Sequence, residues 1–333
     1  MHASPYVRRA PPHSTCDTIA PPRTTGDTIG PPRTTGWTVN GPAPGPADRV
    51  EHGDPHGVAV LYLHGTPGSR VESRLLADAA RRAGVRLIGV DRPGFGQTPL
   101  PGSPRLENWP VRVERLADRL GLDRFAVVGW SGGGVYALAC VAALPDRISR
   151  VALVAPAGPG HGHGVGGWLE TASSSLLATL AGVPGLVTLA GKAAGAARRL
   201  PPLRGRVPTP RTVRTLVAAA QHALRHGAAG WRHELGVLGE DWGPLVTSAR
   251  EAMDARAAAG DPLPLTVWHG TPDRSVPVAE GRALAAALGA LLVEDPDAGH
   301  VGVLVRHAAE VMEFLAGEAA EPQRSAGSGT SGP

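Results

Sequence analysis

Short runs of apolar residues recur along the chain and alternate with longer stretches that have helical spacing. The apolar runs lie at 58–65, 85–91, 124–129, 150–156, 265–270 and 290–294. They are continuous and not alternating, which is typical of strands that are covered on both faces. The stretches with helical spacing lie at 69–83, 109–120, 133–144, 278–288 and 303–314. This repeat predicts an α/β fold with a doubly wound, mainly parallel sheet.

One long stretch interrupts the repeat. Residues 157–261 contain helical but no strand-like runs, and they fall between two successive strands. In a doubly wound sheet such an insertion lies over the carboxyl ends of the strands, where ligands bind, so we predict a helical lid there. The sheet and its helices then occupy 48–156 and 262–317.

The two ends of the chain differ from the rest in composition. The N-terminal part contains a near-repeat, "STCDTIAPPR" followed by "TTGDTIGPPR", which is rich in Thr, Pro and Gly. Segments of this kind bury little apolar surface. We therefore predict a disordered arm at 1–47 and a disordered tail at 318–333.

The charge balance argues against a nucleic-acid partner. The 33 Lys and Arg residues are nearly matched by 29 Asp and Glu, and Tyr and Phe number only 3 each. The basic residues form no run, and the capacity for stacking on bases is small. The expected partner is a small-molecule substrate, and the sequence leaves the oligomeric state open.

An uncharged stretch at 171–191 has the length of a membrane span, but Ser, Thr, Gly and Pro184 dilute it. This composition favours two short buried helices, so no membrane partner is expected. The start of the chain lacks the apolar core of a secretion signal, and Cys16 and Cys140 suggest no disulfide framework. Both features favour the cytoplasm.

The segment "VVGWSGGGVY" places a G-x-S-x-G pattern between an apolar run and a helical stretch. Such a strand–turn–helix junction forces Ser131 into a sharp turn that exposes its hydroxyl, and Gly129 and Gly133 leave room for the close approach. We predict that Ser131 is a nucleophile. The alternative is a glycine-rich loop that holds a phosphate, but "GWSGGG" lacks both G-x-G-x-x-G and GK[ST].

A nucleophilic serine needs a base, and the base needs a carboxylate that orients it. Asp273 follows the apolar run at 265–270, and His300 follows the run at 290–294. Both therefore fall at carboxyl ends of predicted strands, in the order Ser, Asp, His that suits this architecture. Three other acids are closer to His300 in sequence but lie in a polar strand-terminal loop, and we rank them below Asp273 as the orienting carboxylate: Glu294, Asp295 and Asp297.

The segment "LYLHGTPGS" is a suitable loop for an oxyanion hole. Its predicted donor is the backbone N–H of Thr66, and the second donor is the N–H of Gly132, which follows the nucleophile. Trp130 and Trp168 are candidates for lining an apolar substrate pocket, although core packing is the more ordinary role for each.

Other polar residues have simpler interpretations. We interpret Asp91, in "DRPGFG", as a carboxylate that stabilises its turn, and His64 as a hydrogen-bonding residue of the structure. His161 and His163 have no acidic or thiol partner at suitable spacing. No metal site and no cofactor are therefore expected.

Five segments, "LHGTPGSR", "GVDRPGFGQT", "VGWSGGG", "WHGTPDRSVP" and "DAGH", resemble successive signature segments of the α/β-hydrolase fold family. The branch in question includes serine esterases, cofactor-free haloperoxidases, C–C bond hydrolases and proline iminopeptidase-like enzymes. The resemblance covers roughly residues 50–316 and implies that Ser131 is the nucleophile, His300 the general base and Asp273 its orienter. The chain departs from the family at its start, where only residues 48–57 lead into the sheet.

The expected function is that of a serine hydrolase acting on an ester, lactone or amide bond of a small, mostly apolar substrate. Epoxide hydrolases and haloalkane dehalogenases that resemble this chain use an aspartate nucleophile, whereas a serine favours acyl transfer. One alternative is a proline iminopeptidase-like aminopeptidase, which needs acids to bind a substrate ammonium group. The acids that the lid offers are Glu170, Glu234, Glu240 and Asp241. Another alternative is a non-catalytic ligand-binding homologue, although a binder has no need for a complete Ser, Asp and His set.

Overall fold

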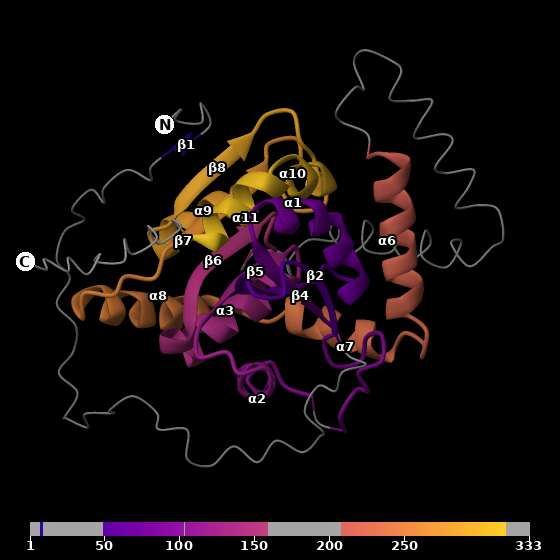
Figure 1. Cartoon of the computed structure of the whole chain (residues 1–333), viewed down its shortest axis with the longest axis horizontal. Coiled ribbons are helices and arrows are strands. Elements are labelled where there is room, and N and C mark those ends of the chain that lie inside the picture. The colour runs from indigo at the N-terminus through magenta and orange to yellow at the C-terminus, as the bar shows by residue number, and fades with distance from the viewer. Residues whose placement is uncertain (1–6, 9–48, 103, 159–207, 318–333) are drawn as a thin grey trace, which may run out of the picture.

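An eight-stranded sheet runs through the middle of the protein (Figure 1). The computed structural model describes residues 7–8, 49–102, 104–158 and 208–317. In spatial order the strands are β1 (Val7–Arg8), β8 (Leu291–Asp295), β7 (Leu265–Gly270), β6 (Ile148–Val154), β5 (Phe125–Trp130), β3 (Val58–Leu63), β4 (Val85–Val90) and β2 (Arg49–Gly53). The strands from β8 to β4 pair in parallel, which confirms the predicted fold class.

The two outer strands run antiparallel to their neighbours. β2 pairs with β4 from Arg49 opposite Val90 to Gly53 opposite Arg86, and β1 pairs with β8. β2 therefore forms one edge of the sheet, within the residues 48–57 that lead into it. Its residues, "RVEHG", are only half-buried or exposed, so the strand carries no apolar run that would have predicted it.

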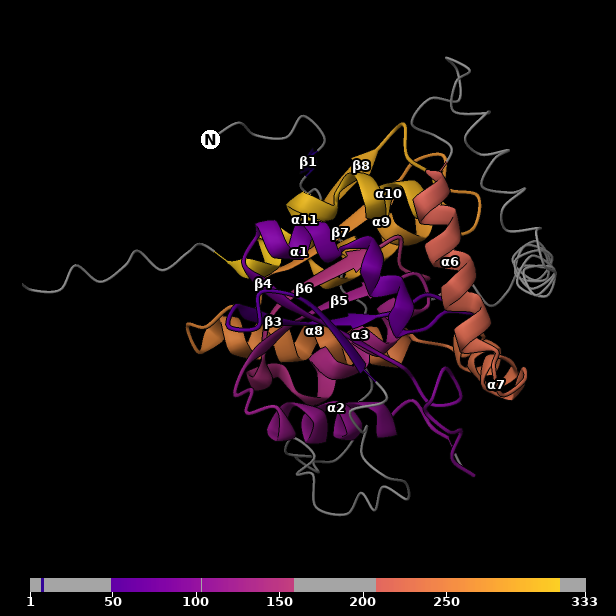
Figure 2. The ribbon, with the colours of Figure 1, turned by 45° about the vertical axis from the view of Figure 1, so that its right-hand side comes forward.

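The continuous apolar runs have the expected physical cause, because helices cover both faces of the sheet (Figure 2). Alternate residues of β3 point into two separate hydrophobic cores. One core is closed by α2 (Asn108–Arg119), α3 (Gly133–Ala143), α8 (Gly243–Ala258) and α9 (Val278–Leu288). The other is closed by α1 (Ala77–Arg82), α10 (His300–Arg306) and α11 (Ala308–Ala316).

Two of the helical stretches break into shorter pieces than the sequence predicts. The stretch at 69–83 forms a 3-10 helix, η2 (Arg70–Leu75), followed by α1, and the Ser69 hydroxyl caps η2. The stretch at 303–314 divides into α10 and α11 at His307, whose ring lies 3.0 Å from the Asp295 carboxylate at the end of β8. In the second case a bond to the sheet coincides with the break in the helix.

The described part of the insertion is helical. α6 (Pro210–Ala223) is capped by Thr209, whose hydroxyl accepts the Thr212 N–H at 3.0 Å, and it is followed by α7 (Ala229–Leu238) and α8. α8 packs along α3 beneath the sheet, whereas α6 and α7 lie beyond one end of it, at the right of Figure 2. The predicted arm apart from β1, residues 159–207 of the predicted lid, and the predicted tail lie outside the described residues. The lid boundaries stay a prediction.

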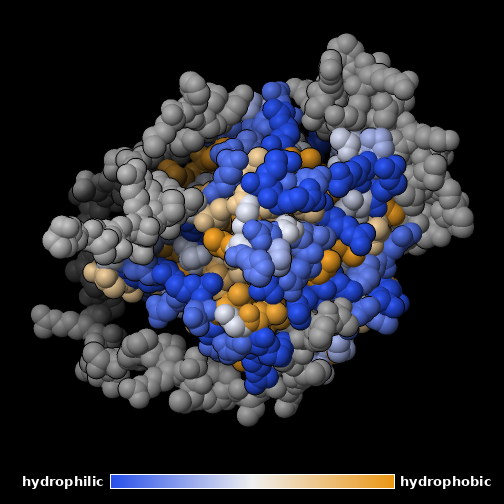
Figure 3. All heavy atoms as spheres, viewed as in Figure 1, coloured by the Kyte–Doolittle hydropathy of each residue, from blue (hydrophilic) through white to orange (hydrophobic). Residues whose placement is uncertain are grey.

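Hydrophilic side chains cover most of the described surface on the face shown in Figure 3. Large hydrophobic side chains that are exposed in the described ranges are Val58 and Leu291. Among the helices of the described residues, none has both the length and the apolar character needed to cross a membrane. The uncharged stretch at 171–191 lies outside these residues.

Candidate active site

Ser131 lies in the turn between β5 and α3 with a left-handed backbone, at φ +55°. This conformation is costly for a residue with a side chain, and it occurs where the surrounding structure enforces it. A Cβ at Gly133 would collide with the Leu63 carbonyl, and one at Gly129 would lie 2.6 Å from the Gly133 carbonyl oxygen. The Ser131 N–H donates to Val154 O of β6 at 3.0 Å. The sharp turn expected from the G-x-S-x-G pattern is present.

Asp273 and His300 meet at the ends of β7 and β8. The Asp273 Oδ1 accepts the N–H groups of Ser275 and Val276 at 2.8 and 3.0 Å, and its Oδ2 lies 2.8 Å from His300 Nδ1. Burial alone would raise the pKa of this carboxyl, but hydrogen bonds from His269, His300 and the Val276 N–H outweigh burial. The pKa of Asp273 is held well below its usual range, so the carboxylate stays charged.

A second histidine, which the sequence analysis did not single out, lies against the same carboxylate. His269 is fully buried, and its Nε2 is 2.9 Å from Val276 O and 3.5 Å from Asp273 Oδ2. Its ring packs on Gly281 of α9, where any Cβ would collide with Nδ1. The signal in the sequence was its place four residues before Asp273, at the end of the same apolar run. His269 thus joins the end of β7 to the loop that carries Asp273.

Trp130 links the nucleophile turn to His300. The indole and imidazole ring centroids are 5.4 Å apart, and Trp130 Nε1 donates to the His300 carbonyl at 3.4 Å. Because Trp130 precedes Ser131, this contact brings the two predicted catalytic segments side by side. Trp130 is 5% exposed, and a Cβ at Gly65 would lie 3.1 Å from its ring. Trp168 lies outside the described residues.

The two predicted oxyanion residues are neighbours in space. A Cβ at Gly132 would collide with the Thr66 hydroxyl oxygen. Among the described residues, no acceptor pairs with the backbone N–H of Thr66 or of Gly132. The Gly65 N–H donates to Glu72 Oε2 at 2.8 Å, and the Tyr62 hydroxyl donates to the same oxygen at 3.2 Å. Burial raises the pKa of Glu72 to about 8. Glu72 thus joins the loop that carries Thr66 to Tyr62 of β3.

A buried ion pair lies on the other side of this loop. Arg92 Nε donates to Glu234 Oε1 at 2.6 Å, and the side chains are 0% and 1% exposed. Burial would lower the pKa of Arg92, but the adjacent Glu234 carboxylate raises it more, so the guanidinium is charged. The sequence indicated Glu234 only as an acid for binding an ammonium group, and it gave no role to Arg92.

His64 and Asp91 have the structural roles expected for them. His64 donates from Nδ1 to Gly65 O at 2.8 Å and accepts the Arg92 N–H at Nε2, 3.2 Å away. Burial holds the pKa of His64 well below its usual range, so the ring is neutral. Asp91 Oδ1 accepts the Arg70 N–H at 2.8 Å, and its carboxylate also pairs with the Arg70 guanidinium.

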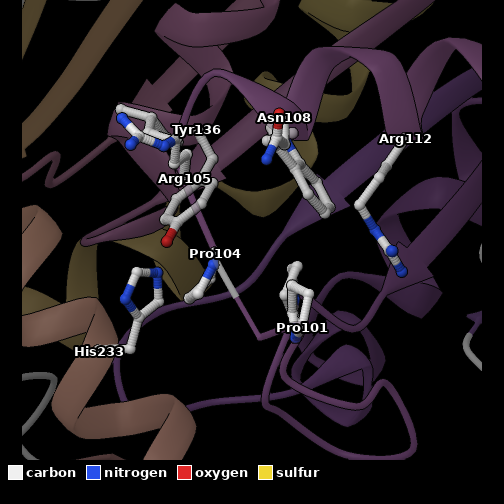
Figure 4. Close-up of a pocket in the computed structure, with 10 residues that line it drawn as sticks. Pro101, Pro104, Arg105, Asn108, Arg112, Tyr136 and His233 are labelled. Atoms are coloured by element: carbon white, nitrogen blue, oxygen red, sulfur yellow. The ribbon is translucent and has the colours of Figure 1, made fainter. Parts of the chain in front are cut away.

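A cavity of about 30 Å³ lies beside Tyr136 and His233, and Ser131 is not among the residues that line it (Figure 4). The Tyr136 hydroxyl points toward the side of the cavity on which His233 lies. A space of this size holds one or two water molecules and is too small for an organic substrate. Within the described ranges, no group of three or more His, Cys, Asp or Glu residues is arranged to hold a metal ion. His161 and His163 lie outside those ranges.

Comparison with known proteins gives an independent assignment of the fold. A sequence model of the family described as alpha/beta hydrolase fold matches residues 58–306. Over 99 residues the chain is 35% identical to a haloalkane dehalogenase of Psychrobacter cryohalolentis, and this alignment covers 28% of this chain and 32% of that protein. Over 96 residues it is 35% identical to a proline iminopeptidase of Xanthomonas citri, and this alignment covers 27% of this chain and 29% of that protein. The matches thus span about a third of these relatives.

A solved structure supports the same fold over most of the chain. It belongs to a study of carboxylesterases from Nitrososphaera gargenis and superposes with a TM-score of 0.58 at 15% sequence identity. The superposition covers 82% of this chain and 97% of that chain. At this identity the likeness shows a shared fold.

Proposed function

The chain belongs to the alpha/beta hydrolase fold family, and on that premise we propose that it is a serine hydrolase that forms an acyl-enzyme at Ser131. Its substrate would be an ester, lactone or amide of a small, mostly apolar molecule. The observation that supports this most directly is the hydrogen bond between Asp273 and His300 at the end of the sheet where Ser131 also lies. A buried carboxylate on Nδ1 directs the other ring nitrogen, Nε2, toward proton transfer.

The proposed reaction is an acyl transfer in two steps. His300 Nε2 takes the proton of the Ser131 hydroxyl as the oxygen attacks the substrate carbonyl carbon. The N–H groups of Thr66 and Gly132 stabilise the resulting oxyanion. When the bond to the leaving group breaks, the imidazolium returns its proton to that group. Water then attacks the acyl-enzyme by the same route and releases the acid, which restores Ser131.

The position of Leu238 supports the proposal that the substrate is mostly apolar. It lies at the end of α7, and a Cβ at Gly132 would be 3.4 Å from its Cδ1. An aliphatic side chain next to a predicted oxyanion donor favours an apolar acyl group over a charged one.

The aminopeptidase alternative has less support from the described acids. The Glu234 carboxylate is already bound to a guanidinium and to the Thr66 hydroxyl, so its charge is compensated inside the protein. Glu240 and Asp241 are exposed, and Asp241 accepts the Gly243 N–H at 2.9 Å at the start of α8. Glu170 lies outside the described residues.

A fluorophosphonate probe tests the proposal, because it reacts covalently with activated serines. The wild-type protein is expected to be labelled, and Ser131→Ala is expected to abolish labelling. A folded wild-type protein that stays unlabelled would favour the non-catalytic homologue. Comparing short acyl esters with aminoacyl arylamides then separates the two enzymatic alternatives, since turnover of arylamides alone would contradict the esterase proposal.

A further inference from the structure

Glu234 connects a helix of the insertion to the loop that carries a predicted oxyanion donor. It lies on α7 and is 1% exposed. Its Oε2 accepts the Thr66 hydroxyl at 2.6 Å, and its Oε1 accepts Arg92 Nε at the same distance. Both bonds are formed between segments that are far apart in sequence. The position of α7 is therefore coupled directly to the loop.

Arg92 extends this contact to the backbone of the loop. Its guanidinium donates to the carbonyl oxygens of His64 and Gly65, the latter at 3.1 Å. The Gly65 carbonyl and the Thr66 N–H belong to one planar trans peptide group, so they point in opposite directions. His64 Nδ1 donates to the same Gly65 oxygen at 2.8 Å, so the guanidinium and the imidazole together hold this carbonyl and thereby the direction of the Thr66 N–H.

The same face of α7 also borders the second predicted donor. Leu238 follows Glu234 by four residues, so the two side chains lie one turn apart on one face of the helix. Gly132 lies between the Thr66 hydroxyl and Leu238, and a Cβ there would collide with the first and lie 3.4 Å from the second. One helix face thus adjoins both residues of the predicted oxyanion hole.

We propose that Glu234 is a positioning residue for the hydrolysis proposed above. It holds Arg92, and through Arg92 it orients the Thr66 N–H toward the developing oxyanion. This inference rests on the proposed function and makes catalysis depend on α7 in addition to the three catalytic side chains. Stability alone does not account for the charges, because buried ion pairs are commonly no more stabilising than apolar pairs of similar volume.

The substitution Glu234→Gln tests the inference in the full-length protein, with Glu240→Gln as the matched control at an exposed position just beyond the end of the same helix. Both variants are assayed with p-nitrophenyl butyrate, and kcat is expressed per site titrated with fluorophosphonate, so that unfolded protein is not counted. Glu234→Gln is expected to lower kcat about 10- to 100-fold with KM nearly unchanged, because a misdirected oxyanion donor weakens binding of the transition state alone. Glu240→Gln is expected to keep both constants.

The double substitution Arg92→Leu with Glu234→Leu distinguishes two roles of the ion pair. One is orienting the Thr66 N–H, and the other is holding α7 against the rest of the protein. An apolar pair retains the packing, so the melting temperature is expected to match or exceed that of Glu234→Gln. The kcat is expected to stay low, because the Gly65 carbonyl keeps its bond to His64 Nδ1 but has lost its guanidinium donor. Wild-type kcat per site in either variant, or a raised KM with kcat unchanged, overturns the inference. An unlabelled wild-type protein overturns the proposed function and this inference together, whereas a labelled wild type with an unaffected Glu234→Gln overturns this inference alone.

Discussion

The Asp273 carboxylate and the His300 imidazole share a hydrogen bond of 2.8 Å, although the two residues belong to different strand-end loops. The carboxylate accepts from Nδ1, and two further backbone N–H groups fix its other oxygen. The imidazole is thereby held in one tautomer and one orientation before any substrate binds.

Asp273→Asn is expected to disrupt this arrangement without removing the side chain. An amide at this position favours the wrong tautomer of His300, so kcat should fall by roughly 10⁴-fold while KM changes little. Steady-state hydrolysis of an activated ester measures both constants. Asp297→Asn is the control, because Asp297 lies on the exposed loop just before His300. A large loss of kcat in Asp297→Asn, with a small loss in Asp273→Asn, would assign the orienting role to Asp297 and contradict the prediction.

Ser131→Gly is expected to be more stable than Ser131→Ala by about 1 kcal/mol, because glycine adopts the left-handed backbone at this turn without the steric cost of a Cβ. Both variants lack the hydroxyl, so the comparison isolates the backbone. Urea unfolding measures the two free energies. Equal stabilities would mean that the backbone at φ +55° stores no strain.

Two glycines of α7 offer a matched pair for testing how closely the helix must approach the loop after β4. A Cβ at Gly230 would collide with the backbone of Gly94, whereas nothing lies within 4 Å of a Cβ at Gly236. Gly236→Ala is expected to stabilise the protein by up to about 1 kcal/mol through helix propensity. Gly230→Ala is expected to destabilise it by about 1 to 3 kcal/mol and to lower ester hydrolysis, because α7 is pushed outward.

Thermal unfolding and ester turnover of the two alanine variants provide the measurements. Unchanged turnover in a folded Gly230→Ala variant would show that the close approach of α7 is dispensable.

Glu72 is expected to make stability depend on pH. Its pKa rises from 4.5 to about 8 on folding, so the folded state binds one more proton than the unfolded state between these values. The free energy of unfolding should therefore fall as pH rises from about 5 to about 8, and level off above that range. Glu72→Gln should remove this slope, while Glu107→Gln, at an exposed position, should retain it.

Measuring the free energy of unfolding at several pH values between about 5 and 8 checks whether stability falls as pH rises. A slope that persists in Glu72→Gln would assign it to another group.

The central strands and the catalytic candidates could be predicted because their signals are local. A continuous apolar run indicates a buried strand. The glycines on either side of Ser131 indicate a sharp turn that exposes its hydroxyl. Asp273 and His300 were found by their places at strand ends, where parallel strands converge. β2 could not be found in this way, because an edge strand with half-buried side chains needs no apolar run.

The residues that support the site depend on contacts between distant segments, and these leave no pattern in the sequence. Glu234 and Thr66 meet across 168 positions, and Arg92 lies in a loop whose glycines suggested only a turn. Charged residues in an insertion are ordinarily solvated, so burial of this pair follows only from the way α7 packs. His269 is similar, since its role depends on the fold of the following loop.

The buried pair of Arg92 and Glu234 limits how freely the insertion could be exchanged between related proteins. A transplanted helix without an acid at the position of Glu234 would leave a guanidinium enclosed with no counter-charge, at a cost of about 3 to 5 kcal/mol. A viable chimera must therefore carry the loop after β4 together with α7, or replace Arg92 in the same step. The two segments therefore have to be exchanged together in any redesign of the insertion.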